Sequence, residues 1–398
     1  MAGLKDLADT INKLKPESQP KFSVIFDTLK ERIISGEYKL GERLPSEGEI
    51  AHRFGVSRMT VVRAVRELQQ LGLVTRRPGS GTYSAFNSEQ GRASFGLLIP
   101  DLGQTEIFEP ICQGMARYPL AGKYSLLWGH SPYGTEKAEE VAEHLCQQFI
   151  SQKVSGVFFA PLELTPVKDL VNRKVVAAFD RAKIPLVLLD RCIYSYPKRS
   201  KYDLVGIDNR RTAFLATEHL IKCGAQRVAF FARQYSAPTV EARIAGYREA
   251  VLNHRSSREE DLVFCADPSD ESFLESALQK YKPDAFLCAN DRTAALLMHT
   301  LLRLNRRIPE DVRIVGIDDV KYASLLPIPL TTQHQPCLDI GAIAMSTMVQ
   351  RLENPTLPTR DILLNCHMVV RDSCGMRGMT EASENGLATS TSRDEEYP

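Results

Sequence analysis

The sequence predicts two structural parts: a small unit of three helices and a hairpin, then a larger α/β core with doubly wound parallel sheets. Helical apolar spacing fills residues 22–83, whereas residues 95–375 alternate apolar strands with amphipathic helices. A short polar stretch at residues 84–94 separates these two styles of sequence. The chain has 398 residues. Its α/β part is longer than a single hydrophobic core usually accommodates, which predicts two lobes there.

The small unit is predicted to begin with two helices. An apolar stripe over Ile25–Ile34 predicts the first helix, which ends at Gly36. Ser46 and Glu49 have the spacing of a capping box, in which each side chain accepts a hydrogen bond from the other's backbone amide. The second helix therefore begins at Ser46 and ends at Gly55.

The third helix and a hairpin complete this unit. Ser57 is the predicted N-cap of a helix that runs to about Leu71, where Gly72 ends it. Residues 73–77 and 82–83 are predicted to pair as strands around the glycine-rich turn 78–81. Three helices followed by a two-stranded wing make a winged helix-turn-helix.

The core is predicted from its regular β-α-β rhythm. Apolar strand candidates are Phe95–Ile99, Tyr124–Trp128, Gly156–Ala160, Pro185–Leu189, Val228–Ala232, Ala285–Ala289 and Ile314–Ile317. Amphipathic helix candidates between them include Lys137–Gln152, Thr212–Lys222, Ala242–Leu252 and Arg292–Leu304. Alternation of this kind is typical of parallel sheets with helices on both faces.

Three segments are expected to lie outside the packed domains. Residues 1–21 form an N-terminal extension that would be either a short docking helix or a frayed leader. Residues 84–94 are predicted to be a linker because they are short, polar and without periodicity. Residues 376–398 are rich in Ser, Thr, Glu and Asp, which predicts a disordered tail.

The composition limits the class of protein. The chain has 43% hydrophobic residues, which is an ordinary globular composition. Its net charge is only +1, so any positively charged surface that binds nucleic acid must be confined to one part of the chain. The nine cysteines form no CxxC pair and show no metal-like spacing with histidine, which predicts reduced thiols and no metal site. We find neither a signal peptide nor an apolar run of about 18 residues, and therefore expect a cytoplasmic protein with no membrane contact.

The third helix has a basic face opposite its apolar one. At 100° per residue, its core side carries Val61, Ala64, Val65 and Leu68, and its other side carries Met59, Val62, Arg63 and Arg66. From Ser57 to Arg77 there are five arginines (58, 63, 66, 76 and 77) and one acid, Glu67. A solvated basic face is the plain alternative, but Arg76 and Arg77 beside the glycine-rich turn favour a DNA-reading helix and wing.

Residues 22–83 resemble the winged helix of GntR-family regulators. The resemblance rests on Leu44–Glu47, Phe54–Arg58, Thr60-Val61 and Arg77–Tyr83 in this order and spacing. It implies that Arg58, Thr60 and Gly79 lie at the DNA.

Two positions depart from the family pattern. Gly48 and Val62 stand where many relatives carry arginines that touch DNA, so the family's operator sequence does not transfer. Val62 instead offers an apolar surface suited to a thymine methyl group.

Polar side chains follow the predicted core strands. In doubly wound sheets, ligands bind beyond the carboxyl ends of the strands. Charged and amide groups there suit the hydroxyls of a sugar. The candidates are Phe108, His130, Glu163, Asp190, Arg191, Arg243, Asn290 and Asp318.

Residues 95–375 are similar to the LacI/GalR effector-binding core, which has the periplasmic-binding-protein-like fold. The resemblance rests on segments that include Gly96–Asp101, Leu188–Arg191, Arg243–Tyr247, Ala289–Asp291, Val315–Asp319, Gln335-Pro336 and Val369–Gly375. It implies that Arg243, Asn290 and Asp318 bind the effector, followed by Asp190, Arg191 and Gln335. The winged helix joined to this core resembles the arabinose-responsive repressors of bacteria.

Several candidates also have structural explanations. Asp190, Asp208 and Asp319 would serve as caps of turns or helices, and His130 is more often a loop residue than a contact. Trp128 more often packs in a core than against a sugar ring, although Phe108 and Trp128 could both stack on one. Arg371 is expected to pair with a carboxylate.

Two other classes of protein are disfavoured. An enzyme that uses pyridoxal phosphate needs a Schiff-base lysine, and no lysine follows a predicted strand in a suitable place. An exported solute-binding protein would carry a signal peptide and no winged helix.

We therefore expect a homodimeric regulator without enzymatic activity, cofactor or metal, which binds double-stranded operator DNA and a small molecule, most simply a carbohydrate. The resemblance implies that helix 108–120 forms the dimer contact. Release of DNA by the effector is commoner among similar proteins, but the sequence also allows the reverse.

Overall fold

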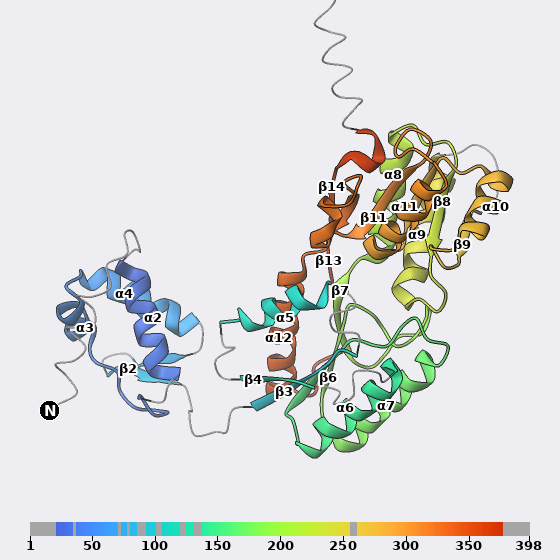
Figure 1. The fold of residues 1–398 in the computed structure, drawn as a ribbon. Helices are drawn as coiled ribbons and strands as arrows, with labels where there is room; N and C mark the ends of the chain where they lie inside the picture. The colour runs from blue at the N-terminus through green and yellow to red at the C-terminus, as the bar shows by residue number, and fades with distance from the viewer. Residues whose placement is uncertain are drawn as a thin grey trace, which may run out of the picture. The chain divides into compact units, whose positions relative to one another are not determined.

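The computed structural model describes residues 21–34, 37–70, 73–77, 80–85, 93–100, 106–119, 124–129, 137–254 and 261–376 (Figure 1). The chain forms two compact units, and the first boundary between them along the chain falls between Ala93 and Ser94. Among the described residues, no helix is long and apolar enough to cross a membrane.

The N-terminal unit has the predicted three helices and hairpin. Its elements are α2 (Lys21–Ile34), α3 (Glu47–Phe54), α4 (Arg58–Gln70), β1 (Val74–Arg77) and β2 (Gly81–Ser84). The capping box is confirmed: Ser46 Oγ accepts from the Glu49 amide at 3.2 Å, and Glu49 Oε2 accepts from the Ser46 amide at 2.7 Å. Gly55 ends α3 in the left-handed conformation, with φ of 60°.

One apolar core holds this unit together. Leu29 of α2, Ile50 of α3 and Leu68 of α4 are buried in it, and Leu73 and Val74 close it beside the antiparallel hairpin β1–β2. The core-facing residues predicted for α4 are all buried, so its opposite face is left to solvent. Strand β2 extends to Ser84 and the next strand begins at Ala93, so regular structure enters both ends of the expected linker.

The first lobe of the larger unit is built on a six-stranded sheet in the order β13-β7-β6-β5-β3-β4. The strands are β3 (Ala93–Leu98), β4 (Tyr124–Trp128), β5 (Gly156–Phe159), β6 (Leu186–Leu189), β7 (Asp203–Ile207) and β13 (Asp361–Leu364). The helices of this lobe are α5 (Phe108–Ala116), α6 (Ala138–Ser151), α7 (Lys168–Ala182) and α12 (Cys337–Glu353). Strands β3, β5, β6, β7 and β13 pair in parallel, as expected for a doubly wound sheet.

The second lobe has a second six-stranded sheet in the order β14-β12-β11-β10-β8-β9. Its strands are β8 (Val228–Ala232), β9 (Val263–Cys265), β10 (Ala285–Cys288), β11 (Arg313–Asp318), β12 (Thr331–His334) and β14 (His367–Val369). Its helices are α8 (Asn209–Lys222), α9 (Pro238–His254), α10 (Glu271–Tyr281) and α11 (Asp291–Arg303), with the short 3-10 turns η2 (Lys321–Ser324) and η3 (Asp372–Cys374). The predicted parallel pairing holds from β9 through β12, and β14 adds an antiparallel strand at the edge.

The chain returns to the first lobe before it ends. Helix α12 crosses α5 so closely that a Cβ on Gly114 would lie 2.1 Å from the Leu338 carbonyl oxygen. A Cβ on Gly341 would lie 1.9 Å from the Ile111 carbonyl oxygen. The buried face of α5 is therefore used within the subunit, and its exposed side carries Glu109 and Gln113.

Candidate DNA interface and effector site

The exposed face of α4 carries the predicted DNA contacts. Ser57 Oγ accepts from the Thr60 amide at 3.3 Å, which caps the start of the helix. Ser57, Arg58, Met59, Arg63 and Arg66 are exposed, and Met59 is 74% exposed, which is unusual for a large apolar side chain. Thr60 and Val62 are partly buried. A helix that presents these side chains from its first turns has the form of a major-groove reader.

An acid from a neighbouring helix also touches the basic face. Glu47 of α3 lies 3.8 Å from Arg58 and forms an ion pair with Arg76 of the wing. Glu47 was not predicted to touch this face, because it lies outside the segment Ser57–Arg77 that carries the five arginines. The net positive charge of this surface is therefore lower than the residues from Ser57 to Arg77 alone would give it.

Two further arginines rest against aromatic rings. The Arg63 guanidinium lies 4.5 Å from the centre of the Phe22 ring and 3.7 Å from Glu67. Arg77 lies 4.7 Å from the Tyr83 ring. Such contacts orient the side chains while their charged ends stay exposed. Gly79 of the wing tip lies outside the described residues.

In the larger unit, most of the predicted effector contacts lie near one another. Glu163 follows β5, Asp190 and Arg191 follow β6, Asp318 ends β11, and Gln335 follows β12. These positions are at the carboxyl ends of strands in both lobes, where ligands bind doubly wound sheets. Arg243 enters from α9 and is buried, as are Asp190, Arg191 and Gln335.

Arg191 links two carboxylates of the first lobe. It forms an ion pair with Glu163, and its Nε lies 3.2 Å from Asp190 Oδ2. Burial opposes ionisation of Glu163, but the charge and hydrogen bonds of Arg191 together hold its pKa below the ordinary value. Burial raises the pKa of Asp190 despite the two nearby arginines. The Arg191 guanidinium also lies 5.5 Å from the ring of the buried Phe108, so Phe108 supports Arg191.

Arg243 is held mainly by neutral acceptors. Its Nε donates to Asn209 Oδ1 at 2.7 Å, and its Nη1 donates to the Ala289 carbonyl oxygen. Its Nη2 is 3.9 Å from Asp318 Oδ1, too long for a hydrogen bond. Burial raises the pKa of Asp318 well above its ordinary value. Asn209 was not among the predicted contacts, and its role follows from this hydrogen bond to Arg243.

Two buried oxygen atoms in this cluster lack donors. Asp190 Oδ1 and Gln335 Oε1 have no hydrogen-bond partner among the described residues. Gln335 is already oriented, because its Nε2 donates to Asp318 Oδ1 at 2.6 Å. A buried unsatisfied acceptor costs about 1–3 kcal/mol, and a ligand hydroxyl could relieve that cost.

Backbone conformation also marks the site. Asp190, Asp318 and Asp319 have φ values of 65°, 134° and 57°, which non-glycine residues seldom adopt. Strained residues of this kind tend to occur at ligand sites. A cavity of about 900 Å³ opens beside Asp318 and Gln335. Its other lining residues come from both lobes and include Ile107, Tyr322 and Leu338.

Other predicted residues have mainly structural contacts. Asn290 caps α11, because its Oδ1 accepts from the Thr293 amide at 2.9 Å. Asp208 caps α8 by accepting from the Arg211 amide at 3.0 Å. His130 lies outside the described residues.

Arg371 pairs with a carboxylate as expected, at 2.7 Å from Asp319. Trp128 is 51% exposed, so the expectation that it packs in the core is wrong.

Asp291 is a buried residue whose role the sequence did not reveal. Its Oδ1 accepts from Thr332 Oγ1 at 2.6 Å, and its Oδ2 accepts from the Val320 amide at 3.1 Å. It thereby fixes the loop that follows Asp318 at the end of β11. Desolvation raises the pKa of Asp291 to about 6.

Two family models match the chain. Residues 22–83 match bacterial regulatory proteins of the gntR family, and residues 217–374 match a periplasmic binding protein-like domain. The first match falls on the helix-and-wing unit. The second covers most of the second lobe together with α12 and β13 of the first lobe.

Curated relatives match over most of the chain. The arabinose metabolism transcriptional repressor of Geobacillus stearothermophilus is 27% identical over 372 residues, which cover 90% of this chain and 99% of that protein. The ribose operon repressor of Halalkalibacterium halodurans is 25% identical, over 79% of this chain and 86% of that protein.

Solved structures share the fold. The transcriptional regulator CelR in complex with cellobiose is 23% identical with a TM-score of 0.60, and the match covers 83% of this chain and all of that one. The transcription regulator CcpA of Lactococcus lactis is 21% identical with a TM-score of 0.60, and the match covers 71% of this chain and 98% of that one.

Proposed function

The chain joins a DNA-binding domain of the gntR type to a periplasmic binding protein-like core, and from this pair we infer that it is a transcription regulator controlled by a small molecule. The exposed arginines of α4 and the wing supply the DNA contacts. A regulator of this kind acts in the cytoplasm, where the chromosome lies, and its chemistry requires no enzymatic step.

The effector is a sugar. The observation that carries this proposal is the pair of buried acceptors, Asp190 Oδ1 and Gln335 Oε1, which lie in the same cluster as the arginines 191 and 243. A hydroxyl both donates and accepts, so one polyol can satisfy carboxylate, amide and guanidinium groups together. Similar proteins point to the same class: two relatives are repressors named for arabinose metabolism and the ribose operon, and one similar structure is a complex with cellobiose.

Arg191, Arg243, Asp190, Asp318 and Gln335 are the proposed direct contacts. Glu163 positions Arg191 through their ion pair, and Asn209 positions Arg243. Asn290 contributes through its amide nitrogen, because its oxygen already caps α11.

The chain acts as a homodimeric repressor that releases DNA when sugar binds. Operators with two related half-sites require two winged helices, and a two-fold dimer presents them at a fixed spacing. A ligand that draws two lobes together changes such a spacing. Any contact through α5 would use its exposed polar side, because α12 covers its apolar face.

A screen of sugars against the purified full-length chain tests this proposal. We expect at least one mono- or disaccharide, among them arabinose, ribose and cellobiose, to raise the melting temperature. The same sugar should weaken binding to DNA selected from a random-sequence pool. Unchanged melting with every sugar, together with normal DNA binding, would refute the effector class and leave the DNA-binding role standing.

A further inference from the structure

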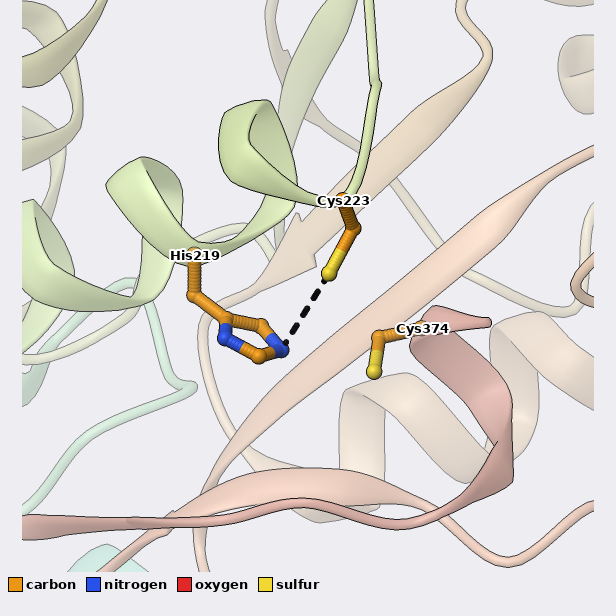
Figure 2. A group of neighbouring side chains, drawn as sticks. All are labelled: His219, Cys223 and Cys374. Carbon is orange, nitrogen blue, oxygen red and sulfur yellow. Dashed lines mark hydrogen bonds between the residues drawn. The ribbon is translucent and has the colours of Figure 1, made fainter. Parts of the chain in front are cut away.

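One histidine and two cysteines, residue types that bind metals, meet in the second lobe. His219 lies in the last turn of α8, Cys223 is the residue that caps this helix, and Cys374 ends η3 (Figure 2). His219 Nε2 is 3.5 Å from Cys223 Sγ. One possible ligand atom from each residue lies within 4.8 Å of the others.

We propose that His219, Cys223 and Cys374 form a zinc site. Zinc bonds of about 2.3 Å to sulfur and about 2.0–2.1 Å to nitrogen place neighbouring ligands of a tetrahedron about 3.6–3.8 Å apart. The 3.5 Å between His219 Nε2 and Cys223 Sγ therefore already matches one edge of such a tetrahedron. Two thiolates and one imidazole form a soft donor set, which binds zinc in preference to magnesium or calcium.

The ligands are fixed by the fold independently of any metal. His219 lies in the last turn of α8, and Cys223 follows it one turn later as the C-cap residue. Residues with this spacing lie on the same face of a helix, so the two side chains are neighbours. The neighbour of Cys374, Ser373, donates from its hydroxyl to the Ile314 carbonyl at 2.7 Å and accepts from the Thr331 amide at 2.9 Å. These bonds hold η3 against β11 and β12. A site whose ligands are already in place loses little entropy when the metal binds.

The surroundings allow a metal to enter. Cys223 and Cys374 are buried, whereas His219 is partly exposed and lines a cavity of about 240 Å³. Three protein ligands leave the fourth tetrahedral position open, and water can occupy it. Bound zinc would tie the end of α8 to the C-terminal turn of the lobe.

This proposal departs from the expectation of a protein without a metal site. That expectation rested on spacing along the chain, and Cys374 lies too far from His219 and Cys223 in sequence to suggest a shared site. The fold brings η3 to the end of α8, because β12 pairs in parallel with β11 and β14 then runs back antiparallel to β12 just before η3.

Zinc titration of the reduced, metal-free full-length chain tests the site, with a chromophoric chelator as competitor. We expect one tight zinc per chain and a higher melting temperature with zinc. His219→Ala and Cys374→Ser should each weaken zinc binding by about 100-fold or more, since even the loss of a group that only hydrogen-bonds to a metal ligand costs about 10–100-fold in metal affinity. Substituted cobalt should give thiolate charge-transfer and tetrahedral d–d bands in the wild type.

Two exposed residues of the same types provide matched controls. His144→Ala and Cys265→Ser should keep the zinc affinity of the wild type, because both residues lie outside the cluster. Circular dichroism shows whether each variant folds, and His219→Ala is the safer variant because its side chain is partly exposed.

Equal zinc affinity in the wild type and His219→Ala would overturn the proposal, as would the absence of tight zinc binding. A disulfide between Cys223 and Cys374 that forms equally in both proteins, without zinc binding, would identify a redox pair instead and would also overturn it.

Discussion

Arg243→Ala is the sharpest perturbation of the effector site. The guanidinium is 5% exposed, bonds Asn209 and the Ala289 carbonyl, and lies 3.9 Å from Asp318. Hydrogen bonds to a charged group contribute about 1.5–3 kcal/mol each, and partners left unsatisfied add to the loss. We expect sugar binding to weaken by about 2–4 kcal/mol, which is about 30- to 1000-fold.

Stability should fall as well, although by less than for a usual buried ion pair. Removal of one partner of such a pair costs about 3–5 kcal/mol, because the other charge stays buried. Since burial already raises the pKa of Asp318, that carboxyl can take up a proton and reduce this cost. Thermal unfolding of the variant measures the remainder.

Calorimetry with the sugar found by screening is the direct assay, and Arg248→Ala is the control. Arg248 lies on the same helix but is half exposed and pairs with Asp261 at the surface. The control should bind sugar as the wild type does. Wild-type sugar affinity in a folded Arg243→Ala protein would refute the site.

Three other predictions concern the DNA face, a buried carboxyl and the helix crossing. Arg66→Ala should weaken DNA binding and reduce by about one unit the slope of log affinity against log salt concentration. Glu47→Gln should instead strengthen DNA binding in anisotropy titrations, because it releases Arg58 and Arg76 from their ion pairs. The pKa of Asp291 is raised to about 6 from 3.8, so the wild type, unlike Asp291→Asn, should lose about 1–3 kcal/mol of unfolding free energy as pH rises through this range. Gly341→Ala should lower the unfolding free energy by about 1–3 kcal/mol, because its Cβ would meet a backbone oxygen at 1.9 Å. Gly48→Ala, whose Cβ finds a single atom at 3.9 Å, should be neutral or stabilise by up to about 1 kcal/mol.

Each of these has a result that contradicts it. Equal salt slopes for Arg66→Ala and the wild type would remove that arginine from the DNA contacts. A constant stability difference between the wild type and Asp291→Asn across pH would mean that the carboxyl titrates normally. Equal denaturation midpoints for both glycine variants would argue against the close helix crossing.

The sequence predicted the features that depend on near neighbours. The capping box of Ser46, the left-handed Gly55 and the buried stripe of α4 each follow from spacing within one or two turns. The strands Tyr124–Trp128 and Val228–Ala232 were predicted to the residue, because each is a short apolar run. The polar strand β12 was missed, since its residues Thr331–His334 lack that signal.

Contacts between distant segments could not be read from local patterns. Glu47 reaches Arg76 across the winged helix, and Asn209 reaches Arg243 between two helices of the second lobe. Asp291 supports the loop after β11 from the start of α11. Each pairing depends on tertiary packing, which places side chains whose separation along the chain gives no signal.

The measurement that tests the account most directly is the affinity of the full-length chain for its selected DNA, with and without saturating sugar, at one salt concentration. Linkage requires that the sugar and the DNA weaken each other by the same factor. We predict a 5- to 150-fold loss of DNA affinity, in line with couplings of about 1–3 kcal/mol. Equal DNA affinity in the presence and absence of a sugar that demonstrably binds would contradict control of DNA binding by that sugar.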